Sequence, residues 1–206
     1  MRKIWLLLCA CAFSMNASCS AAQRGAIGTN PQFEDALDQF KKICLTGEAN
    51  LEATATKARH LGWSDIAKNA NPRVGMELKI FLEIPDFQVS YLQLQSPQSS
   101  ESRFLTLAKI IGPKGRTTFN CLLEIPGWKN QIPHNSVKSL NFGELQDWPY
   151  KENSQYVWND KDPVREVWIS RKTSLDESYP NSTDILPLAG LTLKMVTELS
   201  PNNRAS

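Results

Sequence analysis

The sequence has few of the residues that most enzymes use for chemistry. Its 206 residues include only two histidines, His60 and His134, and five cysteines. It contains no Cys-x-x-Cys pair, so a zinc site would lack ligands. The Gly-x-Ser-x-Gly and Gly-x-x-x-x-Gly-Lys-Ser/Thr patterns are also missing, which argues against a hydrolase nucleophile and a phosphate-binding loop. These gaps predict a protein that is not an enzyme and has no cofactor or bound metal.

An excess of one charge is also missing. The chain has 23 Lys plus Arg and 21 Asp plus Glu. A balanced charge creates no long-range field that would gather nucleic acid or an anionic membrane, despite a small basic stretch at residues 112–116. The apolar run at residues 4–13 is too short for a bilayer-spanning helix, which needs about 20 residues. We therefore predict no nucleic-acid partner and no transmembrane segment.

The N-terminus has the features of a secretory signal peptide. Arg2 and Lys3 precede the apolar run, and residues 20–22 read Ser-Ala-Ala, which are small residues suited to cleavage. We predict that residues 1–22 are a signal peptide and that residues 23–206 form a single exported domain in the periplasm. Loss of Arg2 and Lys3 would leave 21 charges of each sign.

A lipid anchor at Cys19 is the alternative fate of this N-terminus. A bacterial lipoprotein signal has an apolar residue three positions before the cysteine and small residues between. Here that position is Asn16, followed by Ala17 and Ser18. The small residues fit and the apolar one does not, so cleavage before Gln23 is the better prediction.

Two cysteines, Cys44 and Cys121, remain after such processing. Cys44 lies on the apolar stripe of a predicted helix that begins after Asn30 and ends before Gly47. The stripe comprises Phe33, Leu37, Phe40 and Cys44. Cys121 shares the apolar face of a predicted strand with Phe119, Leu123 and Ile125. Both thiols point toward one interior, so a stabilising disulfide is predicted, with two free buried thiols as the alternative.

The rest of the chain predicts one more helix and a series of strands. The helix spans Leu51 to Leu61 and ends at Gly62, with Trp63 folded back on the helix pair. Strands are expected at residues 76–84, 87–94 (with a bulge at Tyr91-Leu92), 103–111, 117–125, 164–171 and 191–199. Leu-Glu-Ile-Pro occurs at 82–85 and 123–126, and both copies are predicted to be strands ended by proline. Helices first and hairpins afterwards predict an α+β fold, with an N-terminal helix pair packed on an antiparallel sheet and one disulfide.

The stretch FKKICLTGEANLEATATKARHLGW resembles the start of a family of uncharacterised exported bacterial proteins and lipoproteins. The resemblance rests on Phe40, Cys44, Gly62, Trp63 and Cys121. Members of that family have an aromatic residue four positions before a cysteine, an Ala-rich helix that ends in Gly-Trp, and a second cysteine on a later strand. The resemblance implies export and this fold, and it implies no mechanism.

The few candidate catalytic residues are not grouped in the sequence. His60 falls on the helix face opposite Leu51 and is expected to meet solvent, and His134 is expected in a loop. Glu83 and Glu124 are the only carboxylates predicted in similar settings, at strand ends, which is a weak indication of a glycosidase. No catalytic residue is predicted.

Residues 125–162 show neither strand alternation nor a helical stripe, yet they are rich in aromatics. A structureless segment of this length is usually functional or disordered, and disordered segments are poor in aromatics. Aromatic residues often anchor interfaces. We predict that Trp148, Tyr150 and Trp158 form a partner surface with Trp128 packed beneath it. The alternative is that these rings cover the open face of the sheet.

These observations predict an exported, non-enzymatic protein that acts as a protein-interaction or envelope-associated module. Its partner would be an unknown protein of the cell envelope. The alternative is a small-ligand domain that binds a glycan or a peptide through the aromatic-rich loop.

Overall fold

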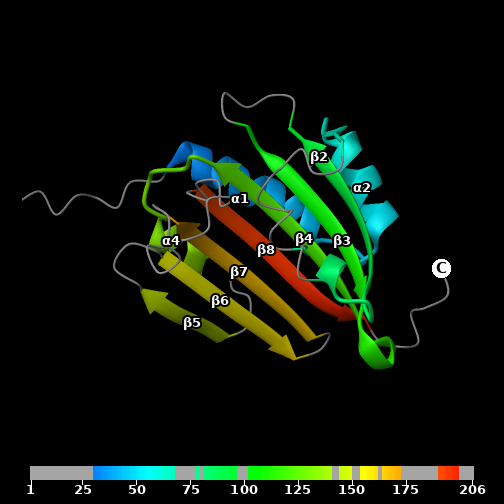
Figure 1. Cartoon of the computed structure of the whole chain (residues 1–206). Coiled ribbons are helices and arrows are strands. Elements are labelled where there is room, and N and C mark those ends of the chain that lie inside the picture. The colour runs from blue at the N-terminus through cyan, green and yellow to red at the C-terminus, as the bar shows by residue number, and fades with distance from the viewer. Residues whose placement is uncertain are drawn as a thin grey trace, which may run out of the picture.

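A computed structural model describes residues 30–67, 78, 81–96, 102–140, 144–149, 154–161, 164–172 and 190–199 (Figure 1). The N-terminal part contains α1 (Pro31–Phe40), a π-helix (Lys41–Leu45) and α2 (Leu51–His60). The strands and the remaining labelled helix are β1 (Ser64–Asp65), β2 (Gln88–Gln95), β3 (Phe104–Ile111), β4 (Thr117–Pro126), α4 (His134–Lys138), β5 (Glu144–Pro149), β6 (Ser154–Lys161), β7 (Val164–Lys172) and β8 (Gly190–Leu199). Among these described residues, no helix combines the length and the apolar character needed to cross a membrane.

The strands form one eight-stranded sheet in the order β1-β2-β3-β4-β8-β7-β6-β5. Every neighbouring pair is antiparallel. A three-residue 3-10 turn, Pro113–Gly115, joins β3 to β4 as the predicted hairpin. The last strand, β8, lies in the middle of the sheet, between β4 and β7. The predicted α+β class with an antiparallel sheet is therefore confirmed.

The first helix forms as its sequence predicts. The side chain of Asn30 accepts hydrogen bonds from the backbone N–H groups of Gln32 and Phe33, which caps the helix start. The helical segment ends after Leu45, and Gly47 follows with a φ of 107°, a conformation that glycine adopts without a steric penalty. The predicted apolar stripe is buried and consists of Phe33, Leu37, Phe40 and Cys44.

The second helix also matches its prediction, except at its C-terminal end. Asn50 caps α2 by accepting a hydrogen bond from the N–H of Ala53, and Ala55 and Ala58 are buried. Trp63 is buried too, and its backbone N–H bonds to the carbonyl oxygen of Ala58. Leu61 was expected on the buried face but is 47% exposed, because the chain leaves the helix at this residue.

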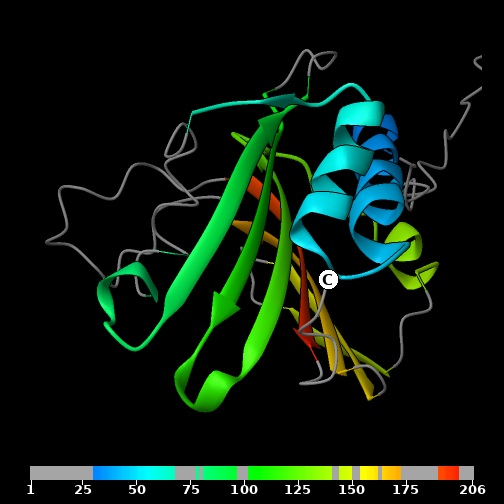
Figure 2. The ribbon, with the colours of Figure 1, turned by 90° about the vertical axis from the view of Figure 1, so that its right-hand side faces the viewer.

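Both helices cover the same face of the sheet (Figure 2). We call this the helix face. Its buried side chains form one apolar cluster that joins α1 and α2 to the strands; the strand members are Leu94, Leu105, Leu107, Phe119, Cys121, Leu123, Ile125, Val167, Ile169, Leu191, Leu193 and Met195. The hydroxyl of Ser136 in α4 donates to the carboxylate of Glu34, which ties α4 to α1. The apolar residues of alternate strand positions therefore build the core.

The segment predicted as a strand at residues 76–84 contains no strand where it is described, and Ile84 lies in a bend. Residues 78 and 81–83 are in helix, so this prediction is wrong. Leu78 is buried, and the half-buried Phe81 packs against the cluster that contains it. The sequence here is rich in Glu, Leu and Lys, which favour helix, and the alternation alone could not distinguish the two periods.

β2 has no bulge, contrary to the prediction. It pairs residue for residue with β3 from Gln88 to Gln95. The apolar residues move from one face of the strand to the other because both faces are partly buried. One face is buried near the start of the strand and the other near its end. Val89 and Tyr91 pack on a small cluster on the outer face, opposite the helices, whereas Leu92 and Leu94 pack on the helix face.

Residues 125–162 are not structureless, which corrects another prediction. β4 continues to Pro126, α4 follows, and β5 and β6 form an antiparallel pair at the end of the sheet. The missed signal is the run Tyr156-Val157-Trp158, because aromatic and β-branched residues favour strands. The segment therefore extends the sheet.

Candidate functional site

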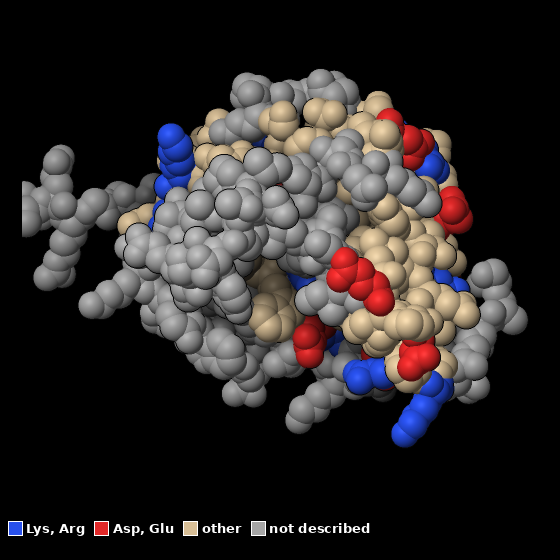
Figure 3. Space-filling view, in the orientation of Figure 1, with Lys and Arg blue, Asp and Glu red and all other residues tan. Residues whose placement is uncertain are grey.

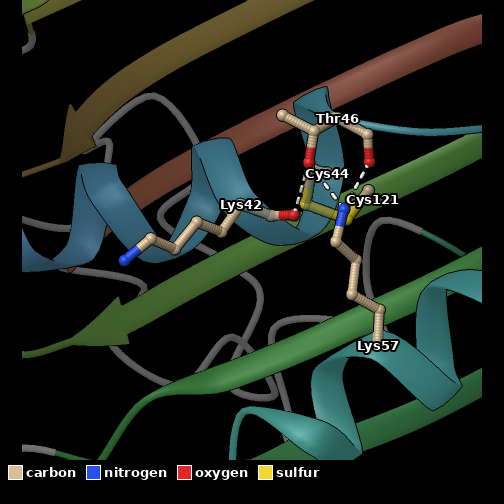
Figure 4. The surroundings of a disulfide bond; sticks show 5 residues. All are labelled: Lys42, Cys44, Thr46, Lys57 and Cys121. Atoms are coloured by element: carbon tan, nitrogen blue, oxygen red, sulfur yellow. Dashed lines mark hydrogen bonds between the residues drawn. A yellow bond between two sulfur atoms is a disulfide. The ribbon is translucent and has the colours of Figure 1, made fainter.

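The helix face is closed by the predicted disulfide, which joins Cys44 and Cys121 with 5.7 Å between their Cα atoms (Figure 4). Cys44 belongs to the π-helix that follows α1, and Cys121 lies in the middle of β4. Both residues are buried, at 6% and 0% exposure. The bond therefore links the helical segment to the centre of the sheet and lies inside the core.

A lysine of the neighbouring helix secures the chain just beyond this disulfide (Figure 4). The Nζ of Lys57 donates to the carbonyl oxygen of Thr46 at 2.6 Å and contacts its Oγ1 at 2.5 Å. The hydroxyl of Thr46 in turn donates to the carbonyl oxygen of Lys42 at 2.7 Å. These bonds satisfy carbonyl groups at the helix end, where no further helical turn follows.

The outer face of the sheet differs in chemistry from the helix face. One cross-strand row on it reads Gln93, Thr106, Leu122, Lys194 and Trp168, taken from β2 to β7. The next row includes Glu124, Thr192 and Ser170. Gln93, Thr106, Glu124 and Thr192 are all buried although they are polar or charged. Buried polar groups normally have hydrogen-bond partners, so a member of this face that has none among the described residues calls for an explanation.

Gln93 and Thr106 are the least satisfied residues of this face, and we call them the polar pair. They stand directly opposite each other in β2 and β3, and they are 2% and 0% exposed. Among the described residues, neither the side-chain amide of Gln93 nor the hydroxyl of Thr106 has a hydrogen-bond partner. Leaving such buried atoms without partners costs about 1–3 kcal/mol each. The pair therefore has unfilled hydrogen-bonding capacity inside the protein.

The other end of the same row lies in a more open part of the face. Lys194 and Trp168 are cross-strand neighbours and are half-buried. The indole N–H of Trp168 donates to a carboxylate oxygen of Glu166 at 3.3 Å, which restrains the ring. Figure 3 shows this face, with a hollow over β7 and β8 whose floor contains uncharged and basic atoms.

A second candidate surface is apolar. Leu82 is 51% exposed and Ile84 is 39% exposed. The residues on either side of them are held on the sheet, since the rings of Phe81 and Phe87 lie 5.3 Å apart and pack against the outer-face cluster of Leu78, Ala108 and Ile110. We call Leu82 and Ile84 the apolar ridge.

Gly112 explains how the ridge is fixed. A Cβ atom at this position would lie 2.9 Å from the ring of Phe87, closer than side chains tolerate. The glycine lets Phe87 pack directly on the β3–β4 turn. The acidic residues Glu83 and Asp86 flank the ridge and are exposed. The ridge is thus an anchored apolar pair with acidic neighbours.

The residues predicted to form a partner surface lie on or near the β5–β6 pair. Trp148 is in β5 opposite Gln155, and Trp158 is in β6 between Leu145 and Val167. Tyr150 lies outside the described residues. The register places Trp148 and Trp158 in different cross-strand rows, and the surface stays a prediction.

Trp128, predicted to pack beneath that surface, is buried at 2% exposure. Its indole N–H donates to the carbonyl oxygen of Asn130 at 2.8 Å, and its ring lies 6.4 Å from that of Phe33. It belongs to the core cluster on the helix face. It is therefore buried, and the ring that it contacts is that of Phe33 in α1.

The candidate catalytic residues come from separate elements. His60 is exposed in the last turn of α2, as predicted, whereas His134 begins α4 and is half-buried. Glu83 is exposed in a helical turn and Glu124 is buried in β4, so the expected similarity of their settings is wrong. Within the described ranges, no group of three or more His, Cys, Asp or Glu residues could hold a metal ion.

An ion pair links α2 to the first edge of the sheet. Arg59 donates two hydrogen bonds of 2.9 Å to the carboxylate of Asp65 in β1. These hydrogen bonds lower the pKa of Asp65 below its ordinary value and raise the pKa of Arg59 above its own. Both groups are solvent-exposed, so the pair is a surface restraint between two elements.

Sequence reasoning missed both candidate surfaces. The apolar ridge was hidden because residues 76–84 were predicted to be one alternating strand. The polar pair was hidden because the polar positions of β2 and β3 resembled an ordinary solvated strand face. A signal for the polar pair was present in principle, since the stretch YLQLQ places glutamine between core leucines.

Comparison with known proteins adds no relative, because the chain matches no family model, no curated protein and no solved structure. The resemblance to exported bacterial proteins and lipoproteins stays a prediction.

Proposed function

We propose that the protein is an exported, non-enzymatic module of the cell envelope that binds a protein partner. In this proposal residues 1–22 are removed as a signal peptide, and residues 23–206 work in the periplasm as one domain built of the helix pair on the sheet. The disulfide between Cys44 and Cys121 supports the location, because such bonds persist in oxidising compartments.

The observation that carries the binding role is the apolar ridge. Exposed apolar side chains that gather in one part of the surface can mark an interface, and Leu82 and Ile84 are two positions apart in one segment. Leu82 and Ile84 are presented by a segment that Phe81 and Phe87 hold on the sheet. An anchored segment loses little conformational entropy on binding, so more of the contact energy is left for affinity.

The charges around the ridge indicate the chemistry of the partner. Glu83 and Asp86 lie beside Leu82 and Ile84 and are exposed. Acidic neighbours would be repelled by an anionic lipid surface and attracted by basic side chains. The partner we propose is therefore a protein with an apolar pocket and basic residues at its rim.

The test is affinity capture from envelope extract with the purified protein and its Leu82→Ser, Ile84→Ser double variant. A partner that binds through the ridge is expected to be lost from the variant, or to bind at least tenfold more weakly, while the melting temperature stays within a few degrees. Leu61→Ser is the matched control, because the exposure of Leu61 (47%) lies between those of Leu82 and Ile84, but Leu61 is at the end of α2. Equal capture by wild type and double variant would contradict this role for the ridge.

The predicted aromatic surface of Trp148, Tyr150 and Trp158 belongs to the same proposal as a second contact region. β5 and β6 lie at the opposite end of the sheet from β2, which follows the ridge. Alanine substitution of each of the three therefore tests a different part of the molecule. Lost capture with an unchanged melting temperature would favour the aromatic surface, and unfolding without selective loss of a partner would favour a structural role.

A further inference from the structure

The side of β2 that faces away from β3 is a sheet edge, and the described strands leave most of it without a neighbour. We propose that this edge pairs with the β2 edge of a second copy of the protein, so that the two sheets join into one across a two-fold axis. The dimer is built on the backbone of β2 and not on the apolar ridge. It therefore goes beyond the proposed function and can fail without affecting it.

β1 covers only the end of this edge. It pairs with the last two residues of β2, and just beyond it the N–H of Ile66 bonds to the carbonyl oxygen of Gln93. Among the described strands, none pairs with this side of β2 from Gln88 to Leu92, and we call these residues the open edge. In Figure 2 the edge faces the viewer, and no described helix or strand crosses in front of it below β1.

The hydrogen bond at Gln93 shows which backbone groups of β2 point outward. In an antiparallel ladder the N–H and C=O of one residue point to the same side, and the sides alternate along the strand. The carbonyl of Gln93 bonds outward to Ile66, so the N–H and C=O of Val89 also point outward, whereas those of Ser90 point to β3. The register between β2 and β3 is unbroken, so the alternation holds along the whole strand. Val89 therefore presents a donor and an acceptor to a further strand.

The side chains of the open edge are accessible at the surface. Gln88 and Ser90 are exposed, and Val89, Tyr91 and Leu92 are half-buried. Gln88 and Ser90 alternate with the outer-face residues Val89 and Tyr91, so they point to the helix face. The helices cover the other end of β2 on that face (Figure 2). A second protein can therefore approach this part of the strand.

The open edge has none of the features that usually keep edge strands from pairing. Natural edge strands are protected by charged side chains, prolines or bulges. β2 reads QVSYLQLQ, without a charge or a proline, and it has no bulge. The strand at the other end of the sheet is different, because β5 reads ELQDWP and contains two acidic residues and a proline. The sequence of β2 is thus typical of a strand with a neighbour on each side.

A second copy of the chain fits this edge because the open edge complements itself. Antiparallel pairing centred on Ser90 sets Gln88 of one copy against Leu92 of the other, so each strand stops where the β1 end of the other copy begins. This register also sets Val89 against Tyr91 of the other copy, and a β-branched residue facing an aromatic one is a favourable cross-strand pair. Because β2 carries no charge, the two strands do not repel each other. The interface is isologous, as in most symmetric dimers.

The first experiment measures the mass of the purified protein by sedimentation equilibrium over a range of concentrations. The wild type is expected to form a dimer. Ser90→Lys and Ser90→Glu each put like charges opposite one another across the two-fold axis and are expected to weaken the dimer about fivefold, with unchanged melting temperatures. An equal mixture of the two variants pairs opposite charges and is expected to associate at least as tightly as the wild type. A wild type that stays monomeric, or a mixture that associates no better than either variant alone, would overturn the proposal.

The second experiment tests the register by cross-linking. Ser90→Cys is expected to give a disulfide-linked dimer on non-reducing electrophoresis, because opposite Cα atoms of a non-hydrogen-bonded antiparallel pair are about 4.5 Å apart. Lys109→Cys is the matched control, since Lys109 is exposed and lies directly opposite Ser90 in β3. The two copies of residue 109 would be three strand spacings apart, about 14 Å, which is too far for a disulfide. Equal cross-linking of the two variants, or no cross-linking of Ser90→Cys, would show that the edges do not pair in this way.

Discussion

The two faces of the sheet are built from the same strands but differ in the side chains that they bury. On the helix face, alternate residues of β3, β4, β7 and β8 are apolar, and α1, α2 and the disulfide cover them. On the outer face, the intervening residues include buried Gln93, Thr106, Glu124 and Thr192. Burying polar groups lowers stability unless they have partners, whereas burying apolar groups raises it. The difference indicates that the helix face maintains the fold and that the outer face is shaped by other requirements.

The disulfide should give the largest effect. Replacing both Cys44 and Cys121 by alanine is expected to lower the free energy of unfolding by about 4 kcal/mol, because the bond closes a loop with a sequence separation of 77. Denaturant unfolding measures this change. A reducing agent should destabilise the wild type by a similar amount and leave the double variant unaffected. Equal stability of the oxidised and reduced wild type would show that the bond contributes nothing to the helix face.

Two adjacent leucines of β4 compare the faces directly. Leu123, 0% exposed, belongs to the core on the helix face, while Leu122, 2% exposed, points to the outer face and belongs to neither apolar cluster. Leu123→Ala is expected to cost about 3 kcal/mol of unfolding free energy, since it opens a cavity among apolar neighbours. Leu122→Ala should cost about 1–2 kcal/mol by the same measurement, because its cross-strand neighbours are Thr106 and Lys194. Equal losses would remove the energetic distinction between the faces.

Thr106→Val tests what the buried polar side chains of the outer face contribute to stability. This change removes a buried hydroxyl that has no partner in the described part of the chain, so stability should stay constant or rise by up to about 1 kcal/mol. Thermal unfolding would measure the change. A loss of more than 1 kcal/mol would mean that the hydroxyl is bonded in solution and that the outer face is better satisfied than the structure indicates.

The ion pair at the sheet edge should have the smallest effect. The pKa of Asp65 is lowered by its hydrogen bonds from Arg59, so the carboxylate adds stability above its unfolded pKa of about 4, and this stability is lost as the pH falls through the lower folded value. Asp65→Asn should therefore destabilise slightly at pH 7 and make no difference at a pH below the folded value. Unfolding curves at the two pH values test this. A larger loss in acid than at pH 7 would contradict the sign.

The sequence predicted the helix face well because its signals are local and redundant. Asn30 as a cap, the stripe ending in Cys44, and the alternation around Cys121 each agreed with the others, so the helices, β3, β4 and the disulfide could be placed. The same reasoning failed where two periods fit one pattern. Leu-Glu-Ile-Pro is a buried strand end at residues 123–126, but at 82–85 its leucine is exposed in a helical turn.

The candidate surfaces could not be predicted for a related reason. Whether Gln93 is solvated or buried depends on what covers β2, and whether Leu82 is core or surface depends on how Phe81 and Phe87 are anchored. Both are tertiary facts that no local pattern contains. The β5–β6 pair was missed because its alternation is interrupted by Asp147 and Pro149, although its aromatic content was noticed.

The central place of β8 determines when the sheet can be completed. Among the described strands, β8 (residues 190–199) is the one that pairs with both β4 and β7, and it comes after all the others along the chain. Synthesis and translocation both proceed from the N-terminus. The strands β1 to β4 and β5 to β7 therefore cannot form one continuous sheet until β8 is present. Cys44 and Cys121 both precede that point, so their bond can form while the second half is still emerging. A chain cut before residue 190 would therefore keep its disulfide and still lack a finished fold.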